Sequence, residues 1–209
     1  MTGTGTVTLA PDTAYFSAGV TDMNADITAV QNSVNTKTTA IIEALRLGGV
    51  DVTKDAKTSG YSVQPQYNYP QNGSPMLTGY RVTNSVNVTV RDINKAGQLL
   101  SVVTQAGANQ VGSVSFGLAD PEAASSMARE QAVLNARSRA ETLAKASGIA
   151  IGAVMTVDDQ SNTPPPRPVA YAYAASGTTA ASGSAAVPPP IQTGETSVTA
   201  TVRVTYTIA

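Results

Sequence analysis

Residues 120–159, DPEAASSMAREQAVLNARSRAETLAKASGIAIGAVMTVDD, place a long helical pattern directly before a strand pattern. The first three residues supply a capping side chain, a proline at the first helical position and an acid in the first turn, all typical of a helix start. We predict a helix from Asp120 to about Gly148. The strand that follows should carry its apolar side chains on one side, at Ile151, Ala153, Met155 and Val157.

Alanine recurs at every fourth position of the predicted helix, at Ala124, Ala128, Ala132, Ala136, Ala140 and Ala144. Each step of four advances about 40° beyond a full turn, so the small side chains spiral slowly around the helix. Such a row permits close backbone approach, either to the sheet or to a neighbouring chain. The simpler alternative is that alanine is a favourable helix former.

Strand and helix patterns also stay separate in the rest of the chain. Apolar and polar residues alternate over 197–208, which predicts an antiparallel strand with one buried face. The other main predicted elements are a strand at 4–20, a helix at 27–45 closed by Gly48-Gly49, and a hairpin of 61–69 with 80–90. This order predicts an α+β fold with mixed or antiparallel sheets, three helices and an internal β-α-β-β pseudo-repeat joined by a short helix.

The 209 residues suit a single domain built from two lobes. We expect one lobe at 1–91, a connecting helix at 92–107 and a second lobe at 108–209. The second lobe includes a segment rich in Pro, Ala and Ser at 160–194, which is either a long excursion or a disordered loop because it has too little apolar surface to fold alone. Its Tyr171 and Tyr173 are candidates for contact with a partner, although chance is the simpler explanation.

Histidine and cysteine are absent from the sequence. Their absence excludes a Ser-His-Asp relay, a thiolate nucleophile, a zinc knuckle, an iron–sulfur cluster and a disulfide. The formal net charge is −1 and the sequence has no basic stripe for phosphates, so we expect no nucleic-acid partner. A calcium-like pattern at Asp22 has Ile27 and Ser33 where the loop needs glycine and glutamate. We therefore predict no catalytic, cofactor-binding or metal-binding residues, and a protein that is not an enzyme.

Charged residues make up only 13% of the chain, well below the roughly 25% of an average soluble domain. Neutral polar residues take their place, a composition common in exported bacterial proteins. No apolar run approaches the roughly 18–20 residues that span a bilayer. Met1 leads directly into Thr2-Gly3, so we expect a mature region without its signal peptide, although a cytosolic protein would begin in the same way.

The predicted hairpin offers surfaces for contact with other molecules. Pro65 predicts that its first strand lies at a sheet edge or carries a bulge, and Met76-Leu77 form an apolar tip. Identical chains commonly cover such edges and patches, so the first hypothesis is a structural, self-assembling homo-oligomer. The alternative is an adaptor that binds a peptide or a small ligand through the tyrosines of the hairpin, with Tyr67 and Tyr69 as candidates.

Several segments together resemble the SIMPL-domain family, with its bacterial periplasmic or outer-membrane-associated immunogenic members. They are residues 3–12, 60–69, 79–92, 107–116, the alanine-rich helix and the ending at 198–208. The resemblance covers the whole chain apart from 160–194. It implies an α+β domain, export to the periplasm or outer membrane, and homo-oligomers that can be ring-like or channel-like. It also implies a link to oxidative-stress tolerance in some members and an adaptor role in others, and it supplies no catalytic residues.

Overall fold

The computed structural model describes residues 1–71, 73–161 and 193–208, and these form two compact units. We call residues 12–116 the inserted unit. The terminal unit consists of residues 1–11, 117–161 and 193–208. The lobes expected at 1–91 and 108–209 divide the chain differently, because residues 1–11 fold with the last strand of the chain.

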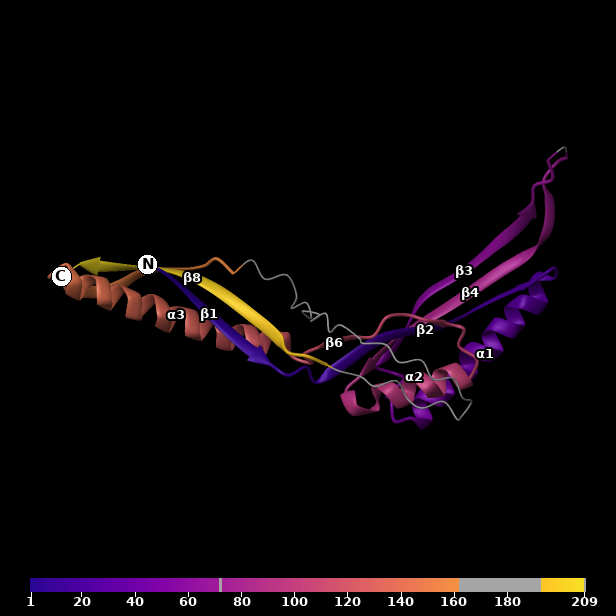
Figure 1. The fold of residues 1–209 in the computed structure, drawn as a ribbon, viewed down its shortest axis with the longest axis horizontal. Helices are drawn as coiled ribbons and strands as arrows, with labels where there is room; N and C mark the ends of the chain where they lie inside the picture. The colour runs from indigo at the N-terminus through magenta and orange to yellow at the C-terminus, as the bar shows by residue number, and fades with distance from the viewer. Residues whose placement is uncertain (72, 162–192, 209) are drawn as a thin grey trace, which may run out of the picture. The chain divides into compact units, whose positions relative to one another are not determined.

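The inserted unit is an antiparallel sheet with helices on one face (Figure 1). Its elements are β2 (Thr13–Asn24), α1 (Ile27–Leu47), β3 (Ala56–Asn68), β4 (Met76–Val90), the 3-10 helix η1 (Ile93–Lys95), α2 (Ala96–Gln105), β5 (Gln110–Val111) and β6 (Ser115–Gly117), whose last residue belongs to the terminal unit. The strand order is β3-β4-β2-β5, and β6 also pairs with β2.

Branched aliphatic side chains fill the space between helix and sheet in the inserted unit. Helix α1 begins at a cap in which the Asp26 carboxylate accepts hydrogen bonds from two backbone N–H groups of the first turn. It ends at Gly48-Gly49, where the positive φ of Gly49 (91°) suits glycine. Its buried stripe carries Val30, Val34, Thr38, Ile41 and Leu45. The segment expected to connect two lobes, 92–107, instead packs into this same core as η1 and α2.

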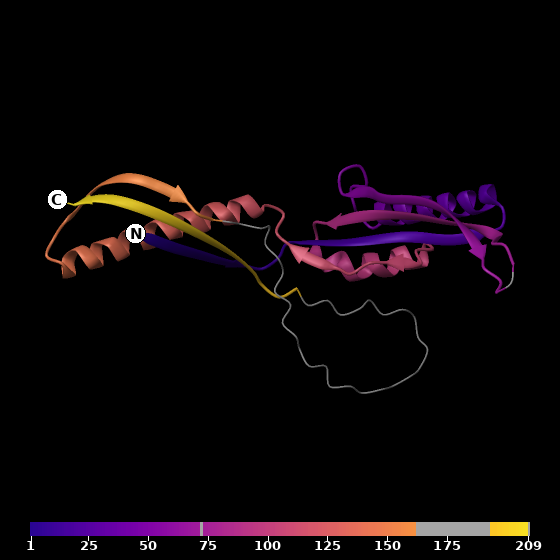
Figure 2. The ribbon, with the colours of Figure 1, turned by 90° about the horizontal axis from the view of Figure 1, so that it is seen from above.

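The terminal unit is a three-stranded antiparallel sheet with one helix. Its elements are β1 (Thr2–Leu9), α3 (Pro121–Ala146), β7 (Ile151–Asp159) and β8 (Thr196–Ile208). The strand order is β1-β8-β7, and Figure 2 shows β7, in orange, beside β8, in yellow. Helix α3 packs mainly on β1 and β8 and barely touches β7.

The alanine row of α3 lies against the sheet. All six alanines from Ala124 to Ala144 are buried, so the close approach that they permit is made to strands of the same chain. The twist that is general to β-sheets suits the slow spiral of the row, and Ala124, Ala128, Ala132 and Ala136 share one core cluster with side chains of β1 and β8. Below the helix, a Cβ added to Gly3 or Gly5 would overlap the backbone carbonyl of Ala132 or Ala128. The two backbones therefore pack with almost no side-chain volume between them.

Both units have the order β-α-β-β and the same strand arrangement. The first strand pairs with the last, giving β2-β4-β3 in the inserted unit and β1-β8-β7 in the terminal unit. The prediction of an α+β fold with three α-helices and antiparallel sheets is confirmed for the described residues. The single strand predicted at 4–20 is wrong, because the chain breaks at residues 10–12 and each half begins a different repeat.

Strand β7 also differs from its predicted facing. Its register with β8 pairs Ile151 with Ile208, Val154 with Tyr206 and Val157 with Val204, with irregularities between these pairs. The three partners alternate along β8 and therefore share one face. Ile151, Val154 and Val157 consequently share that face too, whereas the strict alternation predicted Ala153 and Met155 there. The extra residues of two bulges cause the difference.

Candidate functional site

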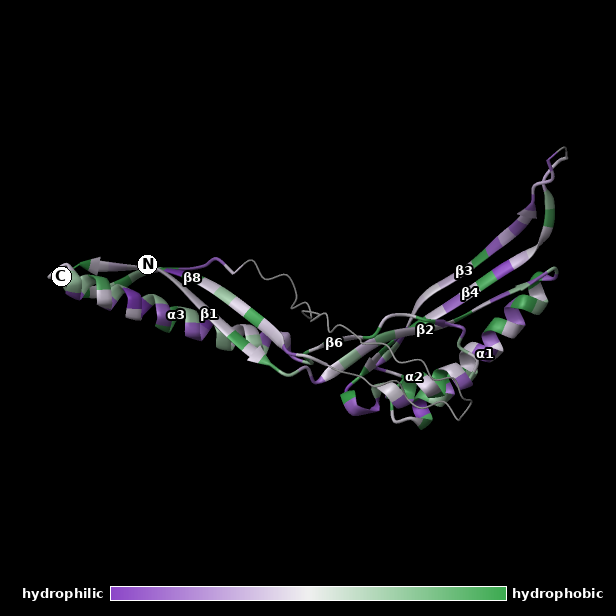
Figure 3. Cartoon of the chain, in the orientation of Figure 1, coloured by the Kyte–Doolittle hydropathy of each residue, from purple (hydrophilic) through white to green (hydrophobic). Residues whose placement is uncertain are grey.

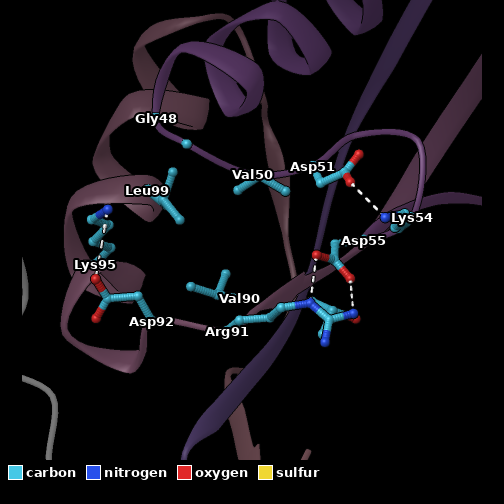
Figure 4. Close-up of a pocket in the computed structure, with 12 residues that line it drawn as sticks. Gly48, Val50, Asp51, Lys54, Asp55, Val90, Arg91, Asp92, Lys95 and Leu99 are labelled. Carbon is cyan, nitrogen blue, oxygen red and sulfur yellow. Dashed lines mark hydrogen bonds and ion pairs between the residues drawn. The ribbon is translucent and has the colours of Figure 1, made fainter.

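A cavity of about 430 Å³ lies at one end of the inserted unit, where α1 ends and η1 begins (Figure 4). Asp55 is 8% exposed at its wall, and both of its carboxylate oxygens accept hydrogen bonds from Arg91, at 2.8 Å from Nε and 2.7 Å from Nη2. The backbone carbonyl of Asp55 accepts a bond from the Thr89 N–H at 2.7 Å. Asp55 thus fastens the loop before β3 to the end of β4.

The other charged groups of this cavity form longer and more exposed ion pairs. Lys54 lies 3.7 Å from Asp51, and Lys95 lies 3.6 Å from Asp92. Hydrogen bonds from Thr53 hold the pKa of the Asp51 carboxyl below its usual value, with Lys54 adding to the effect. A general acid needs a raised pKa, so this shift opposes acid catalysis near neutral pH. The lining of the cavity thus combines three ion pairs, whose charges cancel, with the apolar side chains of Val50, Val90 and Leu99.

Metal binding finds no support in the part of the chain that the structure describes. In those residues no group of three acidic side chains converges to hold an ion. The calcium-like segment is used differently, since Asp26 caps α1 and Asp22 forms an ion pair with Lys37 at 2.8 Å. The Lys37 ammonium, aided by the Ser33 hydroxyl at 2.7 Å, lowers the pKa of Asp22 to about 2.

The structure brings four predicted contact residues together at the end of the β3–β4 hairpin. In the ladder Tyr67 lies opposite Leu77 on one face of the hairpin, and Met76, opposite Asn68, lies on the other face. The ring centroids of Tyr67 and Tyr69 are 6.4 Å apart, with an interplanar angle of 53°. All four side chains are exposed, Tyr69 by 72% and Met76 by 65%, and Figure 3 shows apolar colour at this end of β4. We call Tyr67, Tyr69, Met76 and Leu77 the hairpin tip patch.

The remaining contact predictions have different outcomes. Pro65 lies on β3, which among the described strands pairs with β4 alone, so it does mark a sheet edge. Tyr171 and Tyr173 lie outside the described residues.

A second apolar surface, on β7, was not predicted as a contact site. Val154, Met155 and Val157 are 54%, 65% and 55% exposed although they belong to a strand. Beside the Ile151 end of β7, an apolar groove of about 280 Å³ is lined by Leu143, Ile149 and Ile208 among others. The sequence signal was an apolar strand preceded by a helix whose buried side chains are all small. The short alanine side chains of α3 cover β1 and β8 and leave β7, the third strand, exposed.

The fold places the chain in a class of α+β proteins that contain two β-α-β-β units, each with helices packed on one face of its sheet. The family model that matches residues 1–206 is SIMPL, described as a protein of unknown function (DUF541), and the chain belongs to this family. It is 31% identical to the "26 kDa periplasmic immunogenic protein" of Brucella melitensis over 100% of this chain and 83% of that protein.

Two further relatives are both called "Uncharacterized protein YggE". The one from Edwardsiella ictaluri is 32% identical over 83% of this chain and 72% of the relative. The one from Escherichia coli K12 is 33% identical over 74% of this chain and 62% of the relative. These names indicate no enzymatic activity. Within the described residues, the hydropathy and length of the helices fall short of a membrane span.

Proposed function

We propose that this chain is a periplasmic, non-enzymatic protein of the cell envelope that associates with copies of itself. The observation that carries the proposal is the hairpin tip patch, where four large side chains are exposed on one β-hairpin. Burying one such side chain fully is worth about 1.5–3 kcal/mol, so an uncovered group of four favours a partner. The name of the Brucella relative supports the periplasmic location.

The chemistry of the cavity also supports a role other than turnover. Its acids are held by cations or hydroxyl groups, and the Asp51 pKa is shifted away from the range that a general acid needs. We extend the proposal to a closed, ring-like or channel-like assembly that is associated with the outer membrane and contributes to stress tolerance. This extension rests on the family resemblance. A repeated head-to-tail contact closes into a ring when its rotation permits.

Light scattering of the purified chain coupled to size exclusion tests the self-association. We expect an oligomer at micromolar concentration, and we expect the double variant Met76→Ser/Leu77→Ser to lower its mass. Leu47→Ser is the matched control, because Leu47 is equally apolar and 74% exposed at the end of α1 but lies outside the patch. A wild-type chain that remains monomeric would refute the proposal.

The second candidate function is an adaptor that binds a peptide or small ligand on the same hairpin. The tilted Tyr67–Tyr69 pair favours it, because exposed rings in this geometry offer a platform for apolar or planar groups. The test is a co-purification from periplasmic extract with wild type and with Tyr67→Ala/Tyr69→Ala. Loss of a partner with unchanged oligomer mass would favour the adaptor, and an unchanged set of partners would count against it.

A further inference from the structure

Strand β7 is an edge strand with little cover. Among the described strands it pairs with β8 alone, so its outer backbone groups meet no further strand of the described chain. Helix α3 packs on β1 and β8, which leaves the helix side of β7 open. An apolar edge of this kind is a template for a further strand, and natural proteins normally protect it with lysine, proline, β-bulges or a covering segment. Of these, β7 carries two bulges. β7 itself contains neither lysine nor proline.

The two bulges of β7 bring three apolar side chains onto one face of the strand. They place Ile151, Val154 and Val157 on the helix side of the sheet, three residues apart, with Val154 in the middle. The row is therefore symmetric about Val154. Reversing the direction of the strand about that residue superimposes the apolar positions on each other.

We propose that β7 pairs antiparallel with β7 of a second copy of this chain, about a two-fold axis at Val154. This inference rests on the proposed self-association and names one of its interfaces. The ladder would place Val154 opposite Val154 of the partner subunit, and Ile151 opposite Val157 of the partner subunit. A continuous six-stranded sheet results, with apolar side chains meeting apolar side chains along the helix side.

The charges of β7 favour this pairing over a parallel one. Both carboxylates of the strand, Asp158 and Asp159, lie at its C-terminal end. Antiparallel pairing separates the two acidic ends, whereas parallel pairing in register would set the acids of the two copies side by side. Like charges directly opposite each other destabilise a sheet. Asp159 is already bound by Arg129 at 2.9 Å, and Asp158 lies opposite Arg203, so neither acid needs a partner from the second copy.

The groove at the Ile151 end extends the same interface. Leu143, Ile149 and Ile208 line it and are 53%, 43% and 73% exposed. In the proposed ladder the Val157 side chain of the partner subunit lies beside Ile151, which is one of the residues that line this groove. By the two-fold symmetry, Val157 of this chain lies beside Ile151 of the partner subunit. The interface therefore contacts the apolar side chains of β7 from Ile151 to Val157.

Single cysteines test the pairing directly, because the chain has none of its own. In Val154→Cys the two thiols meet at the axis, where opposed Cα atoms lie about 4.5–5.5 Å apart, within disulfide range. Val157→Cys is the matched control on the same strand and face. Its two thiols would lie about 13 Å apart, because residues 151–157 span only the four-residue length from Val204 to Ile208. In a glutathione redox buffer we expect Val154→Cys to form disulfide dimers faster than Val157→Cys by about tenfold or more.

A second variant guards against an unfavourable angle between two thiols at the axis. Ile151→Cys/Val157→Cys should form dimers as readily as Val154→Cys, although each of its single variants does not. Equal cross-linking at 154 and 157, or none at 154 and none in the double variant, would overturn the inference. If the wild type is still an oligomer in that case, the proposed function stands and its interface lies elsewhere. A monomeric wild type would overturn both.

Discussion

The two units share one β-α-β-β arrangement but fill it with different residues. Helix α1 faces its sheet with valine, isoleucine and leucine, whereas α3 faces its own sheet with a row of alanines. In the terminal unit the missing side-chain volume is replaced by close backbone approach over Gly3 and Gly5. The inserted unit should therefore be sensitive to lost volume, and the terminal unit to added volume.

The largest effect is expected in the core of the inserted unit. Leu45→Ala removes a fully buried side chain from the helix–sheet interface and should lower the free energy of unfolding by about 3 kcal/mol. Urea denaturation followed by circular dichroism measures this loss. Leu47→Ala, two residues along and 74% exposed, should change little. Similar losses in the two variants would show that side-chain volume does not stabilise this unit.

The terminal unit should respond to a single added methyl group. Gly5→Ala places a Cβ into the Ala128 carbonyl, so helix and strand must separate, at a cost of about 2 kcal/mol. The control is Gly60→Ala in the inserted unit, where an added Cβ meets nothing within 4 Å. Its effect should stay within about 0.5 kcal/mol. Equal tolerance at both glycines in thermal unfolding would contradict the close packing of α3.

A smaller, pH-dependent effect should distinguish the inserted unit. The ion pair with Lys37 lowers the pKa of Asp22 from 3.8 to about 2, so its contribution is present above pH 4 and disappears as the pH falls through 2. Asp22→Asn should cost about 1 kcal/mol at pH 7, since both side chains are partly exposed and solvent screens the pair. The difference from wild type should shrink between pH 4 and 2 and vanish below pH 2. A cost that persists there would assign the effect to something other than the charge.

The smallest effect on stability is expected at the exposed apolar edges of both units. Met76→Ser and Met155→Ser each remove a side chain that is 65% exposed, so unfolding should change by less than about 0.5 kcal/mol in either unit. Urea denaturation at a concentration where the chain is monomeric measures this. A large loss in one variant only would mean that its methionine contributes to the core of that unit.

Sequence patterns predicted the helices and strands themselves better than they predicted which strands pair with each other. The start of α3, the hairpin and the alternating β8 were recognisable because local residues decide capping, turns and facing. The split at residues 10–12 was not, because the two halves of one apparent strand differ only in the distant strands with which they pair. The facing of β7 was missed for a related reason, since its bulges exist only relative to β8.

The candidate site shows the same contrast between features set by neighbouring residues and features set by distant ones. The hairpin tip patch was predictable because turn residues and an apolar tip lie within a few positions of each other. The exposure of β7 was not, because it depends on how far the alanine helix reaches across the sheet. The Asp55–Arg91 pair joins residues that are 36 positions apart, and no local pattern indicates it.

The path of the chain has a consequence for the order of folding. In the sheet order β3-β4-β2-β5 every strand comes from residues 13–111, so this unit can form as soon as that stretch is available. In the terminal unit Thr2 pairs with Arg203, and the first strand must wait for nearly the whole chain before its ladder can close. Contacts of such high sequence separation form slowly because a long loop must be closed first. Until β8 is available, β1 has no strand to pair with. During that time chaperones or other nascent chains could bind it.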